Sequence, residues 1–314
     1  MKKHEKIFIA GHKGMAGSAI LRLLEKEGYD NLILADKQTL DLRHFDSVNA
    51  FYENHKPDYI IMAAAKVGGI KINSEQPAVF LYDNLAIQNN LIHCAYLHKV
   101  KKVCFLGSSC IYPRECKQPM KEEYLLTGPL EPTNEGYAIA KIAGLKLAEY
   151  YYRQYGLCCI SLMPCNLYGP NDSFDLDKSH VLSALVRRFS DAHDEKKQEI
   201  TLWGTGAARR EFMHVDDMAR AVLFFLLNYN APSFINVGTG TDVSIKELAE
   251  LIAVKTGYQG KILWDTSKPD GMMRKRLDVS RMIQSGFSTH ISLNEGINQM
   301  LDIYKKIKFS GENS

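Results

Sequence analysis

The order of the first three expected elements, a strand, a glycine-rich turn and a helix, restricts the fold of this chain more than any other feature. The strand is expected at Lys6-Ile7-Phe8-Ile9-Ala10, which is short, apolar and partly β-branched, as in a buried parallel strand. The turn is Gly11-His12-Lys13-Gly14-Met15-Ala16-Gly17, and a helical pattern follows from Ser18 to Leu24. Glycines in this context let backbone amides approach a pyrophosphate at a helix N-terminus. We therefore predict an α/β fold that binds a dinucleotide through residues 11–17.

A second strand is expected at Asn31-Leu32-Ile33-Leu34-Ala35, and Asp36 stands at its end. A carboxylate at about this distance from the glycine turn binds the adenosine ribose in NAD-dependent folds of the Rossmann type. Lys13 and Lys37 would instead suit NADP, because either could pair with its 2′-phosphate as a point charge. Asp36 would turn from the ribose if Lys37 paired with it. The local residues leave NADP(H) and NAD(H) both open.

The first half continues to alternate between strands and helices. Further strands are expected at 58–65, 102–107 and 158–163, with a helix at about 84–98. This pattern predicts a doubly wound parallel Rossmann sheet. The alternation weakens from Asn171 to Arg209, where a smaller α/β lobe for the substrate is expected.

The order of the later elements suggests that the chain crosses between two lobes more than once. We predict a dinucleotide-binding domain from residues 1–167 plus 212–240 and a substrate-binding domain from residues 168–211 plus 241–314. The elements expected in the second half are helices at 183–189, 214–227, 245–255 and 293–307 and strands at 200–204, 233–237 and 261–264.

Composition excludes several classes of protein. With 314 residues and 46% hydrophobic content, the chain can bury a large core, and a net charge of +3 is too small to imply a nucleic acid partner. We find no long apolar run and no signal peptide, and we expect a cytoplasmic protein without membrane contact. The seven cysteines are odd in number and form no Cys-x-x-Cys, so we expect neither a disulfide framework nor a metal site.

Tyr137 and Lys141 are the first candidates for chemistry. They lie four residues apart, so their side chains share one face of a helix, and a nearby cation lowers the pKa of a tyrosine. Such a tyrosine can exchange a proton with a carbinol oxygen. Ser108 lies at the carboxyl end of the strand at 102–107, where open parallel sheets bind ligands. Taken alone, the Tyr-x-x-x-Lys spacing would more often be a solvated helix face.

Several motifs together resemble those of the extended short-chain dehydrogenase/reductase superfamily. They are the glycine turn, Leu106-Gly107-Ser108-Ser109-Cys110-Ile111-Tyr112-Pro113, Glu131-Pro132-Thr133-Asn134, Tyr137-x-x-x-Lys141 and Asn166-Leu167-Tyr168-Gly169-Pro170.

More narrowly, the chain resembles the GDP-L-fucose synthase family, which are GDP-4-keto-6-deoxy-D-mannose 3,5-epimerase/4-reductases. This narrower resemblance is carried by Gly11-His12-Lys13-Gly14-Met15, Ala63-Ala64-Ala65-Lys66-Val67-Gly68-Gly69-Ile70, Ser179-His180-Val181, Arg210-Glu211-Phe212-Met213-His214-Val215-Asp216-Asp217-Met218, Asn236-Val237-Gly238-Thr239-Gly240 and Lys268-Pro269-Asp270-Gly271. The motifs span nearly the whole chain.

The resemblance implies a role for each candidate residue. Ser108, Tyr137 and Lys141 would reduce the C4 ketone, and Cys110 and His180 would be the base and the acid that invert C3 and C5. The cofactor is expected to be NADPH, and the residues implied to bind it are Gly11, His12, Lys13, Gly14, Met15, Ala16, Gly17, Asp36, Lys37, Leu106, Gly107, Ser108, Ser109, Tyr137, Lys141, Pro164, Cys165, Asn166, Leu167 and His180. The residues implied to bind the GDP-sugar are Arg188, Trp203, Arg210, Asp270 and Lys275.

Other functions stay open on the sequence. The substrate could be a GDP-4-keto-6-deoxy-heptose or another GDP-4-keto sugar, and the enzyme could reduce C4 without epimerisation. A redox-neutral sugar-nucleotide epimerase is a further alternative, but a dehydratase would carry an acidic pair where Ser109 and Cys110 stand. A non-catalytic NADP-binding sensor would be expected to lose part of the set Ser108, Tyr137 and Lys141. The helices at 84–98 and 137–155 could form a four-helix homodimer interface, as in relatives.

Overall fold

The computed structural model describes residues 1–176, 179–268 and 270–310. Pro269 of the motif Lys268–Gly271 lies outside the described residues, as do residues 177–178 and 311–314 of the predicted second domain.

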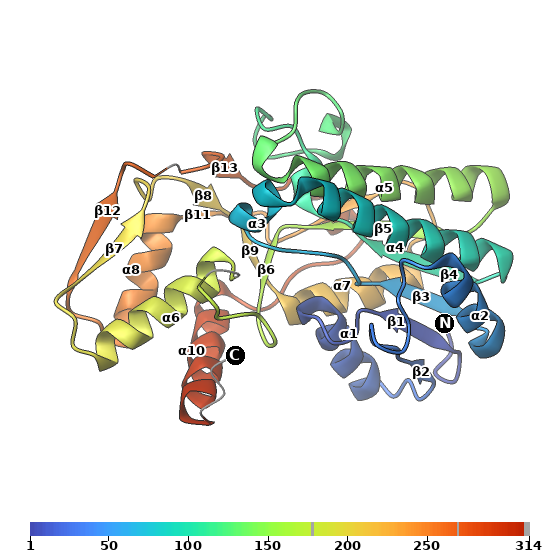
Figure 1. Ribbon diagram of the computed structural model, residues 1–314, viewed down its shortest axis with the longest axis horizontal. Coiled ribbons are helices and arrows are strands. Elements are labelled where there is room, and N and C mark those ends of the chain that lie inside the picture. The colour runs from blue at the N-terminus through green and yellow to red at the C-terminus, as the bar shows by residue number, and fades with distance from the viewer. Residues whose placement is uncertain (177–178, 269, 311–314) are drawn as a thin grey trace.

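A six-stranded parallel sheet forms the centre of the larger lobe (Figure 1). Its strands are β1 (Ile7–Ala10), β2 (Leu32–Ile33), β3 (Tyr59–Met62), β4 (Lys102–Leu106), β5 (Cys159–Pro164) and β10 (Ile235–Val237). Their spatial order is β2-β1-β3-β4-β5-β10, so the chain reverses its direction across the sheet between β1 and β3. Ligands of such sheets bind at this reversal, beyond the carboxyl ends of the strands. The prediction of an α/β fold with a parallel Rossmann sheet is confirmed.

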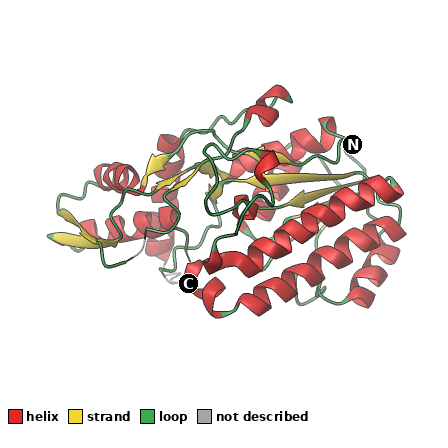
Figure 2. Cartoon of the chain, turned by 90° about the horizontal axis from the view of Figure 1, so that it is seen from above, coloured by secondary structure: helices red, strands yellow, loops and turns green. Residues whose placement is uncertain are grey.

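Helices cover both faces of this sheet, which explains why its strands are continuous apolar runs. Helices α1 (Met15–Lys26) and α7 (Val215–Asn228) pack together below the sheet in Figure 1. Above it lie α4 (Pro77–Leu97) and α5 (Glu135–Tyr155), which run side by side, with α2 (Phe45–His55) against α4 (Figures 1 and 2). All four residues of β1 and all four of β3 are buried between these layers.

A buried lysine fixes α7 to the sheet. Lys102 begins β4, and its ammonium donates hydrogen bonds to the Leu226 carbonyl at 2.6 Å, the Tyr229 carbonyl at 2.5 Å and Asn230 Oδ1 at 2.9 Å. These acceptors lie at the C-terminal end of α7, where carbonyl groups have no partner within the helix. The lysine therefore caps the helix from inside the protein, and burial lowers its pKa.

The smaller lobe lies at the left of Figure 1 and has its own buried cluster. It contains the helices α6 (Val181–Asp194), α8 (Ile245–Thr256) and α10 (Leu293–Ser310) and the paired strands β7 (Glu199–Trp203) and β12 (Lys261–Asp265). Ser244 starts α8 with a reciprocal capping box to Glu247, which explains the sharp beginning of this helix.

Short strands that were not predicted connect the two lobes. β6 (Asn166–Tyr168) pairs with β9 (Phe212–His214), and β8 (Arg209–Arg210) lies between β11 (Val243–Ser244) and β13 (Arg274–Lys275). Each has two or three residues, and an alternating hydrophobic pattern cannot be recognised in so short a segment.

The remaining short elements lie in loops. They are α3 (Ile70–Glu75), α9 (Ser280–Gln284) and 3-10 helices at Ser109–Ile111, Glu122–Tyr124 and Pro132–Asn134.

Two buried clusters divide the described core in a way that bears on the domain prediction. Leu277, Val279, Met282 and Phe287 pack in the cluster of the larger lobe, although the sequence analysis assigned residues 241–314 to the smaller one. The boundaries remain a prediction, and we propose that 277–287 belong with the dinucleotide-binding lobe.

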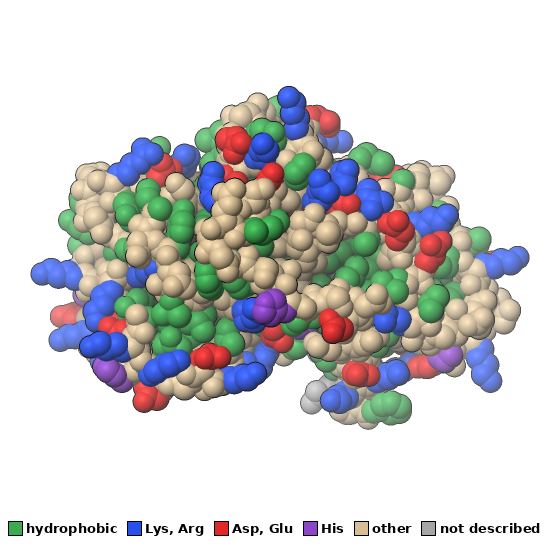
Figure 3. Space-filling view, turned by 180° about the vertical axis from the view of Figure 1, so that it is seen from behind, with side chains coloured by type: hydrophobic (Ala, Val, Ile, Leu, Met, Phe, Trp, Pro, Cys, Tyr) green, Lys and Arg blue, Asp and Glu red, His purple; other side chains and the backbone are tan. Residues whose placement is uncertain are grey.

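Basic and acidic side chains are interspersed over most of the face shown in Figure 3, in keeping with a small net charge. Among the helices that the structure describes, none is both long enough and apolar enough to cross a membrane.

Candidate functional site

The glycine turn packs tightly against the segment that follows β3. Gly11 has φ +88°, and a Cβ on it would lie 2.6 Å from the Ala64 backbone nitrogen. A Cβ on Gly17 would lie 2.1 Å from the Gly11 carbonyl oxygen. Side chains at these positions would strike the backbone of the turn and of the segment after β3, so the glycines are what allows the tight turn before α1, at the reversal between β1 and β3. The turn therefore fits the pyrophosphate of a dinucleotide, which needs close approach to backbone amides.

Other predicted cofactor residues lie at the same edge of the sheet. Leu106 ends β4 and Pro164 ends the neighbouring strand β5, so the segments 106–109 and 164–167 leave the sheet side by side. The Gly107 amide donates to the Leu162 carbonyl at 2.9 Å, which holds them together. Cys165 is buried here and its amide donates to the Val237 carbonyl at 3.0 Å.

Asp36 has a different partner from the one considered in the sequence analysis. Its Oδ2 lies 2.7 Å from the ammonium of Lys13 in the glycine turn. The partner of Asp36 is therefore Lys13 and not Lys37, which the sequence analysis had considered. The Lys13 ammonium, together with the Thr39 backbone amide, lowers the pKa of Asp36 to about 2. The loop after β2 is thereby tied to the turn after β1.

Ser108, Tyr137 and Lys141 come together as predicted. Lys141 is buried on α5, and its ammonium donates to the Leu106 carbonyl at 2.8 Å. The same ammonium lies 5.7 Å from the centroid of the Tyr137 ring. Ser108 follows β4, and its hydroxyl lies close enough to Tyr137 to act on the pKa of the phenol. One turn of helix and one strand end thus bring a phenol, a hydroxyl and an ammonium together.

The pKa of Tyr137 is not lowered as the spacing predicted. Burial raises it, a negative charge at Cys110 would raise it further, and the Ser108 hydroxyl opposes the rise. Burial also lowers the pKa of Lys141 to about 8. The expectation was wrong because desolvation of the buried phenol raises its pKa, and the charge of Lys141 is not among the causes that shift it. A neutral tyrosine is the form that donates a proton.

Cys110 shares this site. Its amide donates to Ser108 Oγ at 3.3 Å, at the start of the 3-10 helix Ser109–Ile111. Burial raises the pKa of the thiol, whereas the positive charges of Lys275 and Lys141 lower it. The thiol is therefore not isolated in an apolar core, since two ammonium groups lie close enough to stabilise a thiolate.

His180 stands apart from this group. It is the N-cap of α6, it is exposed, and its ring makes no capping hydrogen bond. Its positive charge would lower the pKa of Asp172, which burial raises. Among the residues that the structure describes, no hydrogen bond or ion pair joins His180 to Ser108, Cys110 or Tyr137.

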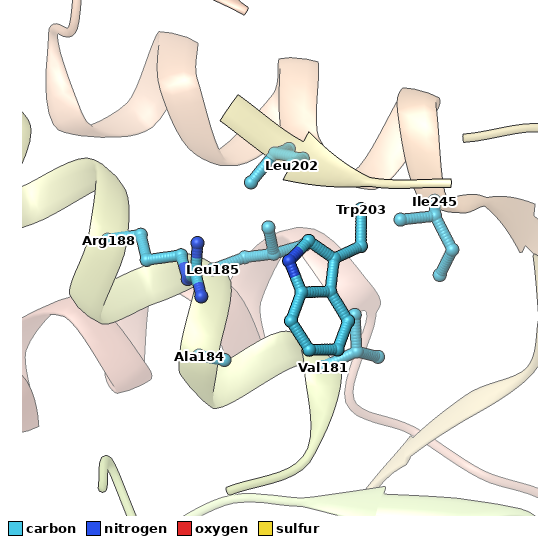
Figure 4. A pocket seen from close by; sticks show the side chains of 7 residues that line it. All are labelled: Val181, Ala184, Leu185, Arg188, Leu202, Trp203 and Ile245. Atoms are coloured by element: carbon cyan, nitrogen blue, oxygen red, sulfur yellow. The ribbon is translucent and has the colours of Figure 1, made fainter. Parts of the chain in front are cut away.

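Arg188 and Trp203 line one pocket of about 170 Å³ in the smaller lobe. Figure 4 shows Arg188 projecting from α6 and Trp203 from β7 toward the same space. The side chain of Trp203 is 69% exposed, so it is not a core residue of its strand. An exposed indole beside a guanidinium can stack on a planar, polar ring.

Arg210 and Lys275 lie opposite each other in the pairing of β8 with β13. Burial lowers the pKa of both, and the charge of Arg210 lowers that of Lys275 further. Two adjacent cations that are partly desolvated favour an anionic ligand such as a pyrophosphate.

Asp270, by contrast, has a structural contact within the smaller lobe. Its carboxylate accepts hydrogen bonds from the Thr205 amide at 2.8 Å and the Thr205 hydroxyl at 2.7 Å, which holds the loop after Trp203.

Glu211 was part of a quoted motif but was not predicted as a site residue. It is fully buried, and its carboxyl group accepts hydrogen bonds from the Leu277 amide and the Gly240 amide, each at 2.7 Å. One donor lies in the loop after β10 of the central sheet, and the other lies in the segment after β13. The signal that could have identified it is a single acidic residue directly before the apolar strand at 212–214.

Comparison with known proteins agrees with this geometry. Residues 7–238 match the NAD dependent epimerase/dehydratase family. GDP-L-fucose synthase 1 of Arabidopsis thaliana is 51% identical over 304 residues, which cover 97% of this chain and 94% of that protein. The GDP-L-fucose synthase of Escherichia coli is 50% identical over 302 residues, 93% and 94% of the two chains.

A solved structure is also similar over nearly the full length. It is a GDP-D-glycero-L-gluco-heptose synthase from Campylobacter jejuni, determined in the presence of NADPH. It superimposes with a TM-score of 0.90 at 38% identity and covers 98% of this chain and 99% of that one.

The pH dependence of stability should report on Glu211. Burial raises its pKa from 4.5 to about 7, so the folded protein holds this proton more tightly than the unfolded chain. The stabilisation is complete below pH 4.5 and is lost as the pH rises through about 7. At about 1.4 kcal/mol for each pH unit, the loss is about 3 kcal/mol. In Glu211→Gln the loss should disappear, so its melting temperature relative to the wild type should rise between pH 5 and 7.5. Parallel pH profiles of melting temperature for the two proteins would contradict the assignment.

Proposed function

The chain belongs to the NAD dependent epimerase/dehydratase family and, within it, to the group of the GDP-L-fucose synthases, and from this membership we propose that it epimerises and reduces a GDP-4-keto-6-deoxy-hexose. The observation that carries the proposal is the meeting of Cys110 with Ser108, Tyr137 and Lys141 at one strand end. A reductase needs only Ser108, Tyr137 and Lys141. A thiol beside them, whose thiolate form is favoured by the charges of Lys275 and Lys141, adds a group that can remove a carbon-bound proton.

We propose NADPH as the cofactor, held by the turn 11–17 and by the strand ends at 106–109 and 164–167. NADPH supplies the hydride that reduces the C4 ketone. Support comes from the glycine turn, whose close backbone packing admits no Cβ at Gly11 or Gly17, and from the similar structure determined in the presence of NADPH.

In the reduction, Tyr137 donates its hydroxyl proton to the oxygen at C4 as negative charge develops there. Burial keeps this hydroxyl protonated until it is needed. Ser108 donates a hydrogen bond to the same oxygen, and Lys141 stabilises the phenolate that remains. Lys141 is held in place by the Leu106 carbonyl at 2.8 Å. The phenolate then regains a proton from solvent.

In the epimerisation, Cys110 as a thiolate removes the proton from a carbon next to the ketone, and the resulting enolate is stabilised by Ser108 and Tyr137. The role of the acid goes to His180 on the family membership alone, since no hydrogen bond or ion pair joins it to Cys110 among the described residues; as an imidazolium it returns a proton to the opposite face of that carbon. The thiol and the imidazole then exchange protons with water, which restores both. Burial raises the pKa of the thiol, and the positive charges of Lys275 and Lys141, which lower it, support its role as the base.

For the nucleotide, we propose that the guanine ring stacks on Trp203 beside Arg188 and that the pyrophosphate binds between Arg210 and Lys275. The exposed indole and the desolvated pair of cations support these assignments. Asp270 would act indirectly, through the loop that carries Trp203.

A heptose substrate is the second candidate, because the similar Campylobacter protein is a GDP-heptose synthase. The ring chemistry would be the same, with one more carbon on the sugar. A C4 reductase of this kind would not need Cys110 as a base.

We further propose a cytoplasmic homodimer. Seven free cysteines suit a reducing compartment. The outer surfaces of α4 and α5 carry large apolar side chains, among them Tyr82 at 71% and Tyr150 at 53% exposure. Side chains of this kind on two adjacent helices could bury each other across a four-helix interface.

Two variants should separate reduction from epimerisation. Tyr137→Phe should slow NADPH oxidation with GDP-4-keto-6-deoxy-mannose by about 100- to 10,000-fold, because the proton donor is lost. It should still exchange deuterium from solvent into C3 and C5, at a reduced rate, because Ser108 remains to stabilise the enolate. Cys110→Ala should lose this exchange by NMR, while reduction of the ketone without inversion remains.

The matched control is Cys116→Ala, since Cys116 is another free cysteine outside the site. It should leave both reactions unchanged. Full exchange in Cys110→Ala would overturn the role of the thiol and favour the reductase alternative.

The interface is tested by molar mass in solution. Light scattering during gel filtration should give about twice 35.5 kDa for the wild type and about 35.5 kDa for Tyr82→Asp/Tyr150→Asp. A charge on each helix would have to be buried in the dimer, which costs more than the contact gains. Val254→Asp, which places a charge on the exposed surface of α8, is the control and should stay dimeric. A monomeric wild type would refute the proposal.

A further inference from the structure

The contact between Lys13 and Asp36 joins the two segments that meet an adenosine ribose in a Rossmann fold. Lys13 belongs to the turn after β1, and Asp36 follows β2, which pairs with β1 in parallel. In such folds the residue after the second strand lies next to the 2′ position of the ribose. The ammonium of Lys13 and the carboxylate of Asp36 are 2.7 Å apart. The ion pair therefore lies at the point where NADPH and NADH differ.

Asp36 is fixed in this position by its own loop. Its Oδ1 accepts hydrogen bonds from the Gln38 amide and the Thr39 amide, each at 3.1 Å, and from the Thr39 hydroxyl at 3.2 Å. Its Oδ2 accepts from Lys13. To turn away, the carboxylate would have to give up three bonds within the loop. With a pKa of about 2 it stays negatively charged across the physiological pH range.

Few other cations are free to neutralise a 2′-phosphate here. Arg43 is nearby in sequence, but its guanidinium pairs with Asp41 at 2.6 Å and with Asp83 at 3.3 Å. Lys37 is exposed and, within the described ranges, pairs with no carboxylate. A 2′-phosphate would thus meet Lys37, a lysine shared with Asp36, and the fixed negative charge of Asp36.

We propose that Asp36 weakens the preference of this chain for NADPH over NADH. It does so by holding Lys13 and by placing a fixed negative charge beside the 2′-phosphate. The same carboxylate can accept a hydrogen bond from the 2′-hydroxyl of NADH, which the phosphate cannot donate. The inference rests on the proposed dinucleotide function, and it assigns to Asp36 the discrimination between the two cofactors.

Equilibrium binding tests this without any turnover. Dissociation constants are measured by calorimetry for NADPH and NADH, and for the fragments adenosine 2′,5′-bisphosphate and adenosine 5′-monophosphate. In Asp36→Asn the ratio of the NADH constant to the NADPH constant should rise by roughly three- to tenfold, as expected for removing one exposed charge beside a phosphate. The ratio of the constant for adenosine 5′-monophosphate to the constant for adenosine 2′,5′-bisphosphate should rise by a similar factor. Lys37→Gln should lower both ratios.

Glu53→Gln is the matched control, because it removes one negative charge from an exposed position on α2. It should leave both ratios unchanged. An unchanged or lower ratio in Asp36→Asn overturns the inference. If the wild type binds neither NADPH nor the bisphosphate, the proposed cofactor and this inference both fail. If the binding ratios change as predicted but the protein does not turn over a GDP-sugar, the role of Asp36 is supported and the proposed substrate is refuted.

Discussion

The buried carboxyl group of Glu211 is the contact on which the relative placement of the site depends. It holds the Gly240 amide, in the loop that follows the central sheet, and the Leu277 amide, in the segment that follows β13. Its own backbone amide donates to the Lys275 carbonyl at 3.3 Å. Arg210 precedes it and Lys275 lies two residues before Leu277. The two cations proposed for the pyrophosphate are therefore positioned by one acid group against the edge of the sheet where Cys110 and Tyr137 lie.

Burial sets the protonation states at that edge. It raises the pKa of Tyr137 and of Cys110 and lowers that of Lys141. Each shift favours the neutral group, as expected where water is excluded. A neutral tyrosine suits reduction, whereas a base for epimerisation must be a thiolate. The charge of Lys275 acts in the direction that a base needs, because it lowers the pKa of the thiol and is not among the causes that shift Tyr137, although burial is the larger effect on Cys110.

Much of the fold could be predicted from periodicity and turn chemistry, but the short elements could not. The sheet strands are apolar runs, and α8 begins at a capping box, so their places follow from local sequence. The helix expected at 84–98 begins at Pro77 instead, since proline is well tolerated in the first turn of a helix. β8 and β13 have two residues each and exist only because tertiary contacts pair them. In the site, the Tyr137–Lys141 spacing was visible, whereas the partner of Asp36 and the role of Glu211 depend on residues distant in sequence.

The central claim is that one site both inverts carbons and reduces a ketone. The most direct measurement is the NMR spectrum of the product formed from GDP-4-keto-6-deoxy-mannose and NADPH in deuterated water. The account predicts GDP-L-fucose with deuterium at C3 and C5, because protons removed by Cys110 exchange with solvent before a proton is returned. A C4-reduced product that keeps its original configuration and carries no deuterium at C3 or C5 would contradict it.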